Sequence, residues 1–393
     1  MTNERDLTYT KDQTYTNWML IIGVMMIATT LRVPLTSVGP LIPSIREDLM
    51  INHTVAGFIT FALFSPFAPK IANKMGMEMT IAISIFILLI GMSLRSFSTI
   101  TTLLFGTLLI GLAIAVGNVL IPAIIKVNFP LRVGLMTGFY AVFMNVFGAL
   151  GSGLSVPLSE VSFLNWQGAL LLWSILVFLA FLLWLPQVRN RRKTAGLKAE
   201  RSPKINLYRS PVAWAVTIFM GGQSLAFYTA ITWLPEMLST LGYGAAASGW
   251  LVFLLQLSLI PTTFIVPMFA ERMENQTMLA LATGIIFILG FLLLFLPVKW
   301  LAPITVLILG VACGAAFSLS MMFFSLRTNN GMEAAELSGM AQSFGYLLAA
   351  TGPVFVGLLY DLGNSWTLPL LFLIIISAIV LLAGIFAGKK GTV

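Results

Sequence analysis

Long apolar stretches alternate with short polar connections along almost the entire chain. Each stretch is long enough to cross a bilayer as an α-helix, which needs about 20 residues. No ten-residue alternation of apolar and polar positions indicates a membrane β-barrel. The pattern therefore predicts an all-α membrane protein with twelve spanning helices, at residues 18–45, 54–72, 79–97, 101–126, 134–157, 164–186, 211–238, 246–268, 277–297, 301–325, 336–360 and 366–387.

One long polar segment interrupts this pattern near the middle of the chain. We expect residues 187–210 to form a basic cytoplasmic linker between two six-helix bundles, at residues 18–186 and 211–388. Residues 1–17 are polar and too long and acidic for the first region of a signal peptide. They are predicted to be a cytoplasmic tail, and the first helix is predicted to be retained.

The two halves repeat one another in sequence. Gly57 matches Gly249, and residues 72–75 match residues 270–273. Matching halves of this kind are typical of duplicated transporters. Six residues fewer separate the two matches in the first half than in the second. This difference predicts a second helix roughly 9 Å shorter than the eighth.

The composition and the distribution of charge agree with a membrane protein. Hydrophobic residues make up 58% of the chain and charged residues only 9%, which excludes an ordinary soluble domain with its roughly 25% charge. If the N-terminus lies inside, 18 of the 22 Lys and Arg residues lie on the inner side. The positive-inside rule then places both termini in the cytoplasm and the chain in the cytoplasmic membrane. The net charge of +8 therefore requires no nucleic-acid partner.

The sequence lacks the patterns that enzymes use. It has no paired carboxylates, no metal-ligand cluster and no Walker-type glycine-rich loop. Its single cysteine, Cys313, lies in an apolar stretch and cannot by itself form a disulfide or a thiolate metal site. We expect no enzymatic activity, no ATP-powered transport, no cofactor and no bound metal.

Arg32 is the most informative residue, because it lies inside the first apolar stretch. A charge at bilayer depth costs about 2.5–3.5 kcal/mol on insertion scales, so it is usually retained for function. No carboxylate occupies a mid-helix position: Glu236 and Asp361 lie near outer helix ends, and the only histidine, His53, precedes the second helix. Arg32 therefore lacks an obvious protein counter-ion, which favours an anionic substrate and argues against a carboxylate proton relay.

The connection at residues 66–78 resembles the loop signature of the major facilitator superfamily, Gly-x-Leu-x-Asp-Arg-x-Gly-Arg-Arg. Asn73 replaces the acidic residue, Lys74 takes the basic position, Gly76 is kept, and Glu78 replaces a terminal arginine. An ordinary polar turn is the alternative. The resemblance implies a gate at this loop and at its counterpart in the second half, formed by Asn73, Lys74, Glu78, Glu271 and Arg272.

Longer segments resemble the cyanate-permease branch of that superfamily, the CynX/NimT-like carriers. They are residues 31–34, 117–138, 219–228 and 233–235. The resemblance implies the major facilitator fold and a carrier that works by alternating access on small anions or planar nitrogen compounds. Residues 148–153 weakly resemble a glycine-rich antiporter signature, and close helix packing alone is the favoured explanation for them.

In that fold, helices 1, 2, 4, 5, 7, 8, 10 and 11 line the cavity, so polar residues within these helices are candidate ligands. Unpaired polar groups facing lipid are costly. Amides at this depth could instead join helices, and Arg32 could clamp neighbouring carbonyl groups. The predicted substrate-binding residues are Arg32, Ser37, Asn118, Tyr140, Asn145, Gln223, Tyr228, Gln256, Gln342 and Tyr346.

Three functions remain open at this point. The leading hypothesis is a secondary transporter that moves a small anion, either cyanate- or nitrate-like or a small organic acid, across the cytoplasmic membrane. The first alternative is an exporter of a neutral planar aromatic, nitro or azole compound, with Arg32 in a cation–π contact. The second is a membrane receptor or enzyme without transport. The expected partners are the small-molecule substrate and the lipid bilayer, and the expected oligomeric state is a monomer.

Overall fold

The computed structural model describes residues 4–38, 41, 71–72, 74–97, 99–161, 163–189 and 207–393. The comparison between the second and eighth helices lies outside the described residues, as do His53 and Asn73. Within the described ranges the ordered structure consists of helices and turns.

The described residues contain eleven α-helices, which correspond to the eleven predicted helices other than the one at residues 54–72. Two single-turn 3-10 helices, η2 (Leu207–Arg209) and η3 (Lys299–Leu301), precede α10 and α13. The α-helices are α1 (Glu4–Thr36), α5 (Met77–Arg95), α6 (Ile100–Asn128), α7 (Val133–Ser159), α8 (Asn165–Arg189), α10 (Pro211–Thr240), α11 (Ala245–Arg272), α12 (Thr277–Leu293), α13 (Ala302–Leu326), α14 (Gly331–Gly363) and α15 (Thr367–Gly388).

The first helix differs from its prediction at both ends. It begins at Glu4, inside the segment predicted as a tail, because residues 4–22 contain neither glycine nor proline to interrupt a helix. It ends at Thr36, earlier than predicted, and a turn follows at Ser37. The Gly39-Pro40 pair explains the early end, since a residue before proline disfavours helical backbone angles.

Side-chain caps mark the start of several helices. The Thr99 hydroxyl accepts a hydrogen bond from the Thr102 backbone N–H at the start of α6. Ser210 and Asn330 do the same for the backbone N–H groups of Ala213 and Glu333 at the starts of α10 and α14. These caps satisfy donors that the first helical turn leaves free.

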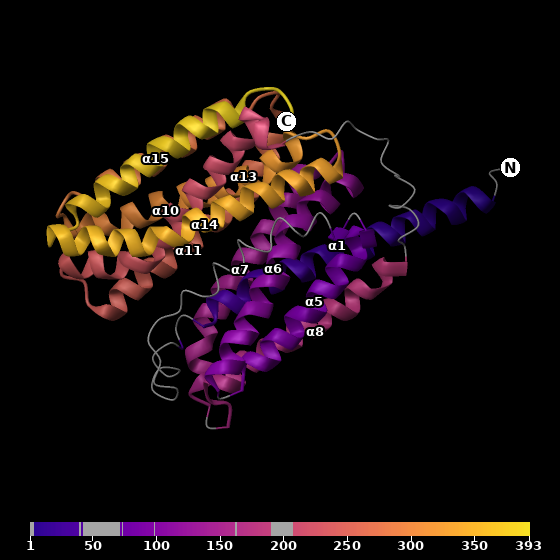
Figure 1. Ribbon diagram of the computed structural model, residues 1–393, viewed down its shortest axis with the longest axis horizontal. Helices are drawn as coiled ribbons and strands as arrows, with labels where there is room; N and C mark the ends of the chain where they lie inside the picture. Colours follow the sequence, from indigo (N-terminus) through magenta and orange to yellow (C-terminus); the bar gives the residue numbers. More distant parts are fainter. Residues whose placement is uncertain are drawn as a thin grey trace.

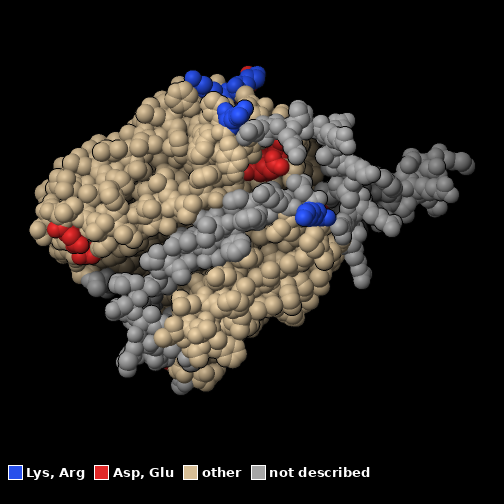
Figure 2. Space-filling view, viewed as in Figure 1, with Lys and Arg blue, Asp and Glu red and all other residues tan. Residues whose placement is uncertain are grey.

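In the described part of the chain, nine helices are long and apolar enough to cross a membrane by length and composition. The helix α12 is apolar but shorter, with 17 residues. On the face shown in Figure 2, charged side chains gather toward two ends of the molecule, and the flank between them is uncharged. This separation suits a protein whose middle is surrounded by lipid.

The helices before the linker pack mainly on one another, and so do the helices after it (Figure 1). In the first set, α1 packs on α7 and α8, and α5 packs on α6 and α8. In the second set, α10 packs on α14 and α15, and α11 packs on α13. Small residues permit this closeness: a Cβ atom at Gly221 would lie only 2.9 Å from the Gly345 Cα atom on α14.

The two sets meet through α7 on α11 and α6 on α14. We use the term linker end for the end of the helix bundle where α6, α8, α11, α13 and α15 finish and where α7, α10 and α14 begin. The contacts between the sets described below are concentrated in the middle of the bundle and at this end.

Candidate substrate site

Arg32 lies where the two sets of helices meet. Its Nη1 atom donates a hydrogen bond to the Oδ1 atom of Asn145 on α7, and Tyr228 on α10 forms a side-chain hydrogen bond with it. The guanidinium carbon lies 5.0 Å from the ring centroid of Phe227 and 5.6 Å from that of Phe317. Both distances are within the range of cation–π attraction. The cation of α1 is thus surrounded by an amide of its own half and by aromatic side chains of the other half.

The sequence of α7 makes room for this arginine. Gly148 lies one turn after Asn145, and a Cβ atom there would lie 3.0 Å from Cδ of Arg32. At Gly151, one further turn along, a Cβ atom would lie 2.9 Å from Oγ1 of Thr36. Close packing of α7 on α1 therefore accounts for these two glycines.

A cavity opens beside the guanidinium group, but it is narrow. The volume open to the centre of a water-sized sphere is about 10 Å³, which is room for about one water molecule. The cavity must therefore widen before it can hold a substrate. Its lining consists of Arg32, Gln223, Ser224, Phe227, Tyr228, Leu259, Cys313, Phe317 and Tyr346.

Four of the predicted ligands line this cavity: Arg32, Gln223, Tyr228 and Tyr346. Asn145 does not line the cavity, but its side chain accepts a hydrogen bond from Arg32, which does. The Gln223 amide donates to the Ser224 hydroxyl over 2.7 Å. Part of its hydrogen-bonding capacity is therefore already used before a substrate binds.

The other predicted ligands lie away from this cavity. The Tyr140 hydroxyl donates to Oδ1 of Asn118 over 2.8 Å, and the Gln342 amide donates to the Asn118 carbonyl oxygen over 3.0 Å. These bonds join α6 to α7 and α6 to α14, which is the helix-joining role that mid-membrane amides can have. Ser37 is buried in the turn after α1, and Gln256 is half-buried on α11.

Five lining residues were absent from the sequence prediction: Ser224, Phe227, Leu259, Cys313 and Phe317. A weak signal existed, because residues three and four apart share a helix face. Phe227 follows Gln223 by four positions on α10, and Phe317 follows Cys313 by four on α13. Since the chain contains 29 phenylalanines, aromatic content alone does not single these two out.

The lining carries one charged group, the Arg32 guanidinium. Glu236 and Asp361 are exposed near the opposite end of the bundle from the linker end. Within the described residues, no cluster of His, Cys, Asp and Glu could hold a metal ion. The cavity therefore has a positive centre in a largely apolar wall, an environment that favours a negative ligand.

Polar bonds join the two sets of helices at the linker end. Nζ of Lys126, in the last turn of α6, donates to the Ser325 carbonyl oxygen over 2.6 Å and to the Thr328 hydroxyl over 2.7 Å. It also donates to the Thr328 carbonyl oxygen. These acceptors lie at the C-terminal end of α13, where the helix dipole favours a cation.

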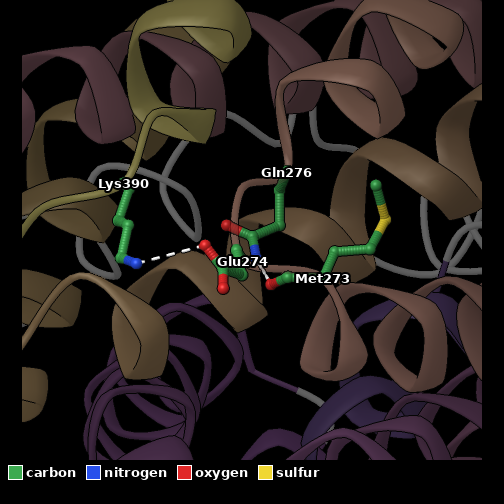
Figure 3. A network of polar contacts seen from close by, with 4 residues as sticks. All are labelled: Met273, Glu274, Gln276 and Lys390. Atoms are coloured by element: carbon green, nitrogen blue, oxygen red, sulfur yellow. Dashed lines mark hydrogen bonds and ion pairs between the residues drawn. The ribbon is translucent and has the colours of Figure 1, made fainter.

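A second polar cluster ties the end of α15 to the connection between α11 and α12. Figure 3 shows Lys390 paired with Glu274 over 3.1 Å and the Gln276 amide donating to the Met273 carbonyl oxygen over 2.8 Å. Arg327 donates to Gln276 and to the Ala387 carbonyl oxygen. Burial lowers the pKa of the Arg327 guanidinium below its ordinary value.

The predicted gating residues occupy different surroundings. Lys74 is exposed, whereas Glu78 is buried at the start of α5, where its carbonyl oxygen accepts from the Trp184 indole over 2.9 Å. Glu271 and Arg272 end α11 and line a groove that also includes Arg132. The structure thus brings Glu271 and Arg272 to the boundary between the two sets of helices.

The sequence profile of the Major Facilitator Superfamily matches residues 19–350. The chain belongs to this superfamily. This membership confirms the predicted fold class, and it confirms the function as secondary transport of a small substrate rather than catalysis.

Curated relatives place the chain more closely. It is 43% identical over 382 residues to the transporter YycB of Bacillus subtilis (strain 168), covering 95% of this chain and 94% of the relative. It is 39% identical to the 2-nitroimidazole transporter of Escherichia coli (strain K12), covering 94% and 95%. It is 24% identical to the cyanate transport protein CynX of the same strain, covering 88% and 91%. The resemblance to the cyanate-permease branch is confirmed.

Solved structures agree on the fold. The proton:xylose symporter XylE superimposes with a TM-score of 0.75 at 11% identity, covering 94% of this chain and 95% of the symporter. The family match and this superposition together describe a multi-pass membrane transporter with the major facilitator architecture.

Proposed function

We propose that this transporter carries a small anion and that Arg32 binds the anion directly. The observation that supports this proposal is the charge of the central cavity, where Arg32 is the charged lining residue and carboxylates are absent from the lining. A cyanate- or nitrate-like anion or a small organic acid would complement it. A guanidinium group suits such ligands, since its planar fork can donate two parallel hydrogen bonds.

The partners of Arg32 suggest how binding proceeds. In the narrow cavity, Phe227 and Phe317 face the guanidinium group and contribute only about 0.5–2 kcal/mol of cation–π attraction each. An arriving anion exchanges this attraction for charge-assisted hydrogen bonds, which are stronger. Because the rings belong to the second half, the exchange changes the contact between the halves as well as the occupancy of the site.

Asn145 acts as a positioning residue in this scheme. Its amide oxygen fixes one edge of the guanidinium group, and the space at Gly148 admits the side-chain stem. These contacts fix the orientation of the guanidinium group before the anion arrives. Less conformational entropy is then lost when the anion binds.

We take the hydrogen-bonded linker end as the closed side of an alternating-access cycle. We place this end and both termini in the cytoplasm, because the Lys and Arg residues concentrate there. The chain then lies in the cytoplasmic membrane, and it works as a monomer. Release of substrate to this side requires the bonds of Lys126 and Gln342 between the halves to break. Lys74, Glu78, Glu271 and Arg272, together with Asn73, take part in this gate.

A second candidate function is transport of a neutral planar nitro or azole compound. Two observations favour it: the aromatic faces of Phe227 and Phe317 in the lining, and the 39% identity to a 2-nitroimidazole transporter. In this case Arg32 would donate hydrogen bonds to a nitro group or a ring nitrogen without compensating a full charge.

A transport assay in proteoliposomes separates the candidates. Counterflow of labelled substrate, tested over small anions and over nitro and azole compounds, identifies what is carried. The current per turnover at zero pH gradient then reports the charge that moves with it. Anion transport predicts counterflow of an anion and its inhibition by other small anions. Counterflow of neutral compounds alone would favour the second candidate, and ligand binding without counterflow would exclude both.

A further inference from the structure

A groove at the linker end straddles the two halves, and neither proposed function uses it as a binding site. We call it the linker-end groove. Its volume is about 460 Å³. The first half contributes the connection between α6 and α7 and the first turn of α7, and the second half contributes the last turns of α11. The lining consists of Pro130, Leu131, Arg132, Leu135, Met268, Glu271 and Arg272.

The groove has an excess of positive charge. Arg132 and Arg272 are both exposed. Among the described residues, the only ion pair with an N···O distance of 4.0 Å or less joins Lys390 to Glu274. Neither arginine therefore has a carboxylate of the described residues within that distance. Glu271 is the single acid in the lining, which leaves a net charge of +1. Arg132 also precedes the first turn of α7 without capping it by its side chain. The free N–H groups of that turn add a further attraction for an anion.

The apolar part of the groove continues toward the middle of the bundle. Leu131 is 92% exposed. Beyond Leu135, the exposed side chain of Phe139 follows one turn further along α7, and exposed Phe269 and Ile265 run the same way along α11. The Phe139 ring contacts that of Phe264 with centroids 5.2 Å apart, so the apolar track also spans both halves.

Next to the lining residues of the groove, α7 and α11 are in direct contact. A Cβ atom at Gly134 would lie 2.4 Å from the Pro267 carbonyl oxygen, so only glycine permits this approach. The shape of the groove therefore depends on the linker end being closed, and separation of the halves would pull its two arginines apart.

We propose that the linker-end groove binds the headgroup of an anionic phospholipid. The phosphate group lies between Arg132 and Arg272 at the start of α7, and the acyl chains follow the exposed apolar side chains of α7 and α11 into the bilayer. Arginine forks suit phosphate oxygens, and basic pockets between membrane helices are a recognised setting for such headgroups. Because both halves supply ligands, the bound lipid stabilises the state in which the linker end is closed.

The test measures lipid binding to the purified full chain in a neutral detergent. Native mass spectrometry would give apparent dissociation constants for phosphatidylglycerol and phosphatidylcholine with identical acyl chains, and thermal unfolding would be followed in parallel. We expect phosphatidylglycerol to bind at least tenfold more tightly and to raise the unfolding temperature. The double variant R132Q/R272Q should bind it about 30-fold more weakly, corresponding to about 1 kcal/mol for each charge.

Matched controls separate the site from general charge. The variant K389Q/K390Q removes two positive charges near the same end and should keep the affinity of the parent chain. E271Q removes the negative charge of the groove and should bind phosphatidylglycerol more tightly than the parent chain does. This gain in affinity tests the proposal even if R132Q/R272Q fails to fold. R32A should leave lipid binding unchanged, which keeps this test independent of the proposed anion site.

Three results would overturn the proposal. Equal affinity for the two lipids would show that the headgroup charge is not recognised. Unchanged binding in folded R132Q/R272Q, or in E271Q where the double variant does not fold, would place the lipid elsewhere. Stabilisation by inorganic phosphate that phosphatidylglycerol does not exceed would assign the groove to a free anion instead of a lipid.

Discussion

Two cations of the first half reach into the second half, and their partners differ. Arg32 of α1 meets the ring faces of Phe227 and Phe317. Lys126 of α6 meets three oxygen atoms at the C-terminal end of α13. Arg32 thus has aromatic faces and the side chains of Asn145 and Tyr228 around it in the middle of the bundle, whereas Lys126 has three oxygen acceptors at the linker end.

This difference distinguishes a binding site from a structural contact that holds the two halves together, which we call a latch. A hydrogen bond to a charged group contributes about 1.5–3 kcal/mol, and the oxygen atoms around Lys126 belong to Ser325 of α13 and to Thr328, which follows that helix. No ligand is needed to satisfy that ammonium group. The guanidinium group of Arg32 has five N–H donors and is bonded to the side chains of Asn145 and Tyr228, so an anion can add charge-assisted hydrogen bonds to it. We infer that Arg32 serves substrate binding and that Lys126 serves closure.

The strongest way to break this comparison is to remove the binding cation. R32A should lower anion uptake at least 100-fold, because the cavity then has no positive charge, while the chain stays folded. R32K should recover only part of the activity, since an ammonium group lacks the planar fork. Uptake would be measured in proteoliposomes and normalised to protein that elutes as a single folded species. Uptake by R32A at the parental rate would end the anion hypothesis.

Removal of the latch should have the next largest effect, and on conformation rather than on binding chemistry. K126M should destabilise the closed linker end by about 2 kcal/mol, which shifts the balance between closed and open states about 30-fold toward the open state. Distances between spin labels on α6 and α13 would report this change. K390M is the control, because its exposed ion pair contributes at most about 1 kcal/mol. Identical distance distributions in K126M and the parent chain would show that Lys126 is no latch.

A substitution beside Arg32 sharpens the assignment of roles within the site. N145D keeps an acceptor for the guanidinium group but adds a negative charge that neutralises it. We expect the affinity for an anion to fall about tenfold, equivalent to about 1.4 kcal/mol, while a neutral planar ligand keeps its affinity. N128D adds the same charge at the exposed end of α6 and should change neither. Equal losses for both ligand types in N145D would indicate disrupted packing instead of altered charge.

The smallest effect is expected from the carboxylates near the other end of the bundle. Glu236 and Asp361 are exposed and absent from the cavity lining. Neither E236Q nor D361N should change uptake driven by a pH gradient by more than about twofold, because a proton relay needs its groups within hydrogen-bonding reach. Loss of pH-driven uptake in either single variant would show that a carboxylate relay operates after all.

Sequence patterns identified the candidate site only in part. Arg32 stands out because a charge within an apolar stretch is costly. The amides were harder to assign, because Asn118, Asn145 and Gln342 are all amides within apolar stretches. In the structure, Asn118 and Gln342 join α6 to α14, whereas Asn145 binds Arg32. In the sequence analysis Lys126 contributed only to the positive charge of the inner side. Nothing in its local sequence indicates that α13 ends beside it.

The sequence by itself determined the class of the protein, the approximate positions of its described helices apart from the two ends of α1, and the presence of a cation at bilayer depth. These properties are local: they depend on the length of each apolar stretch, on caps such as Thr99 and on the cost of burying one charge. Only the tertiary structure decided which side chains meet that cation. Phe227 and Phe317 follow Arg32 by 195 and 285 residues in the sequence, and their approach depends on packing between the halves rather than on any sequence period.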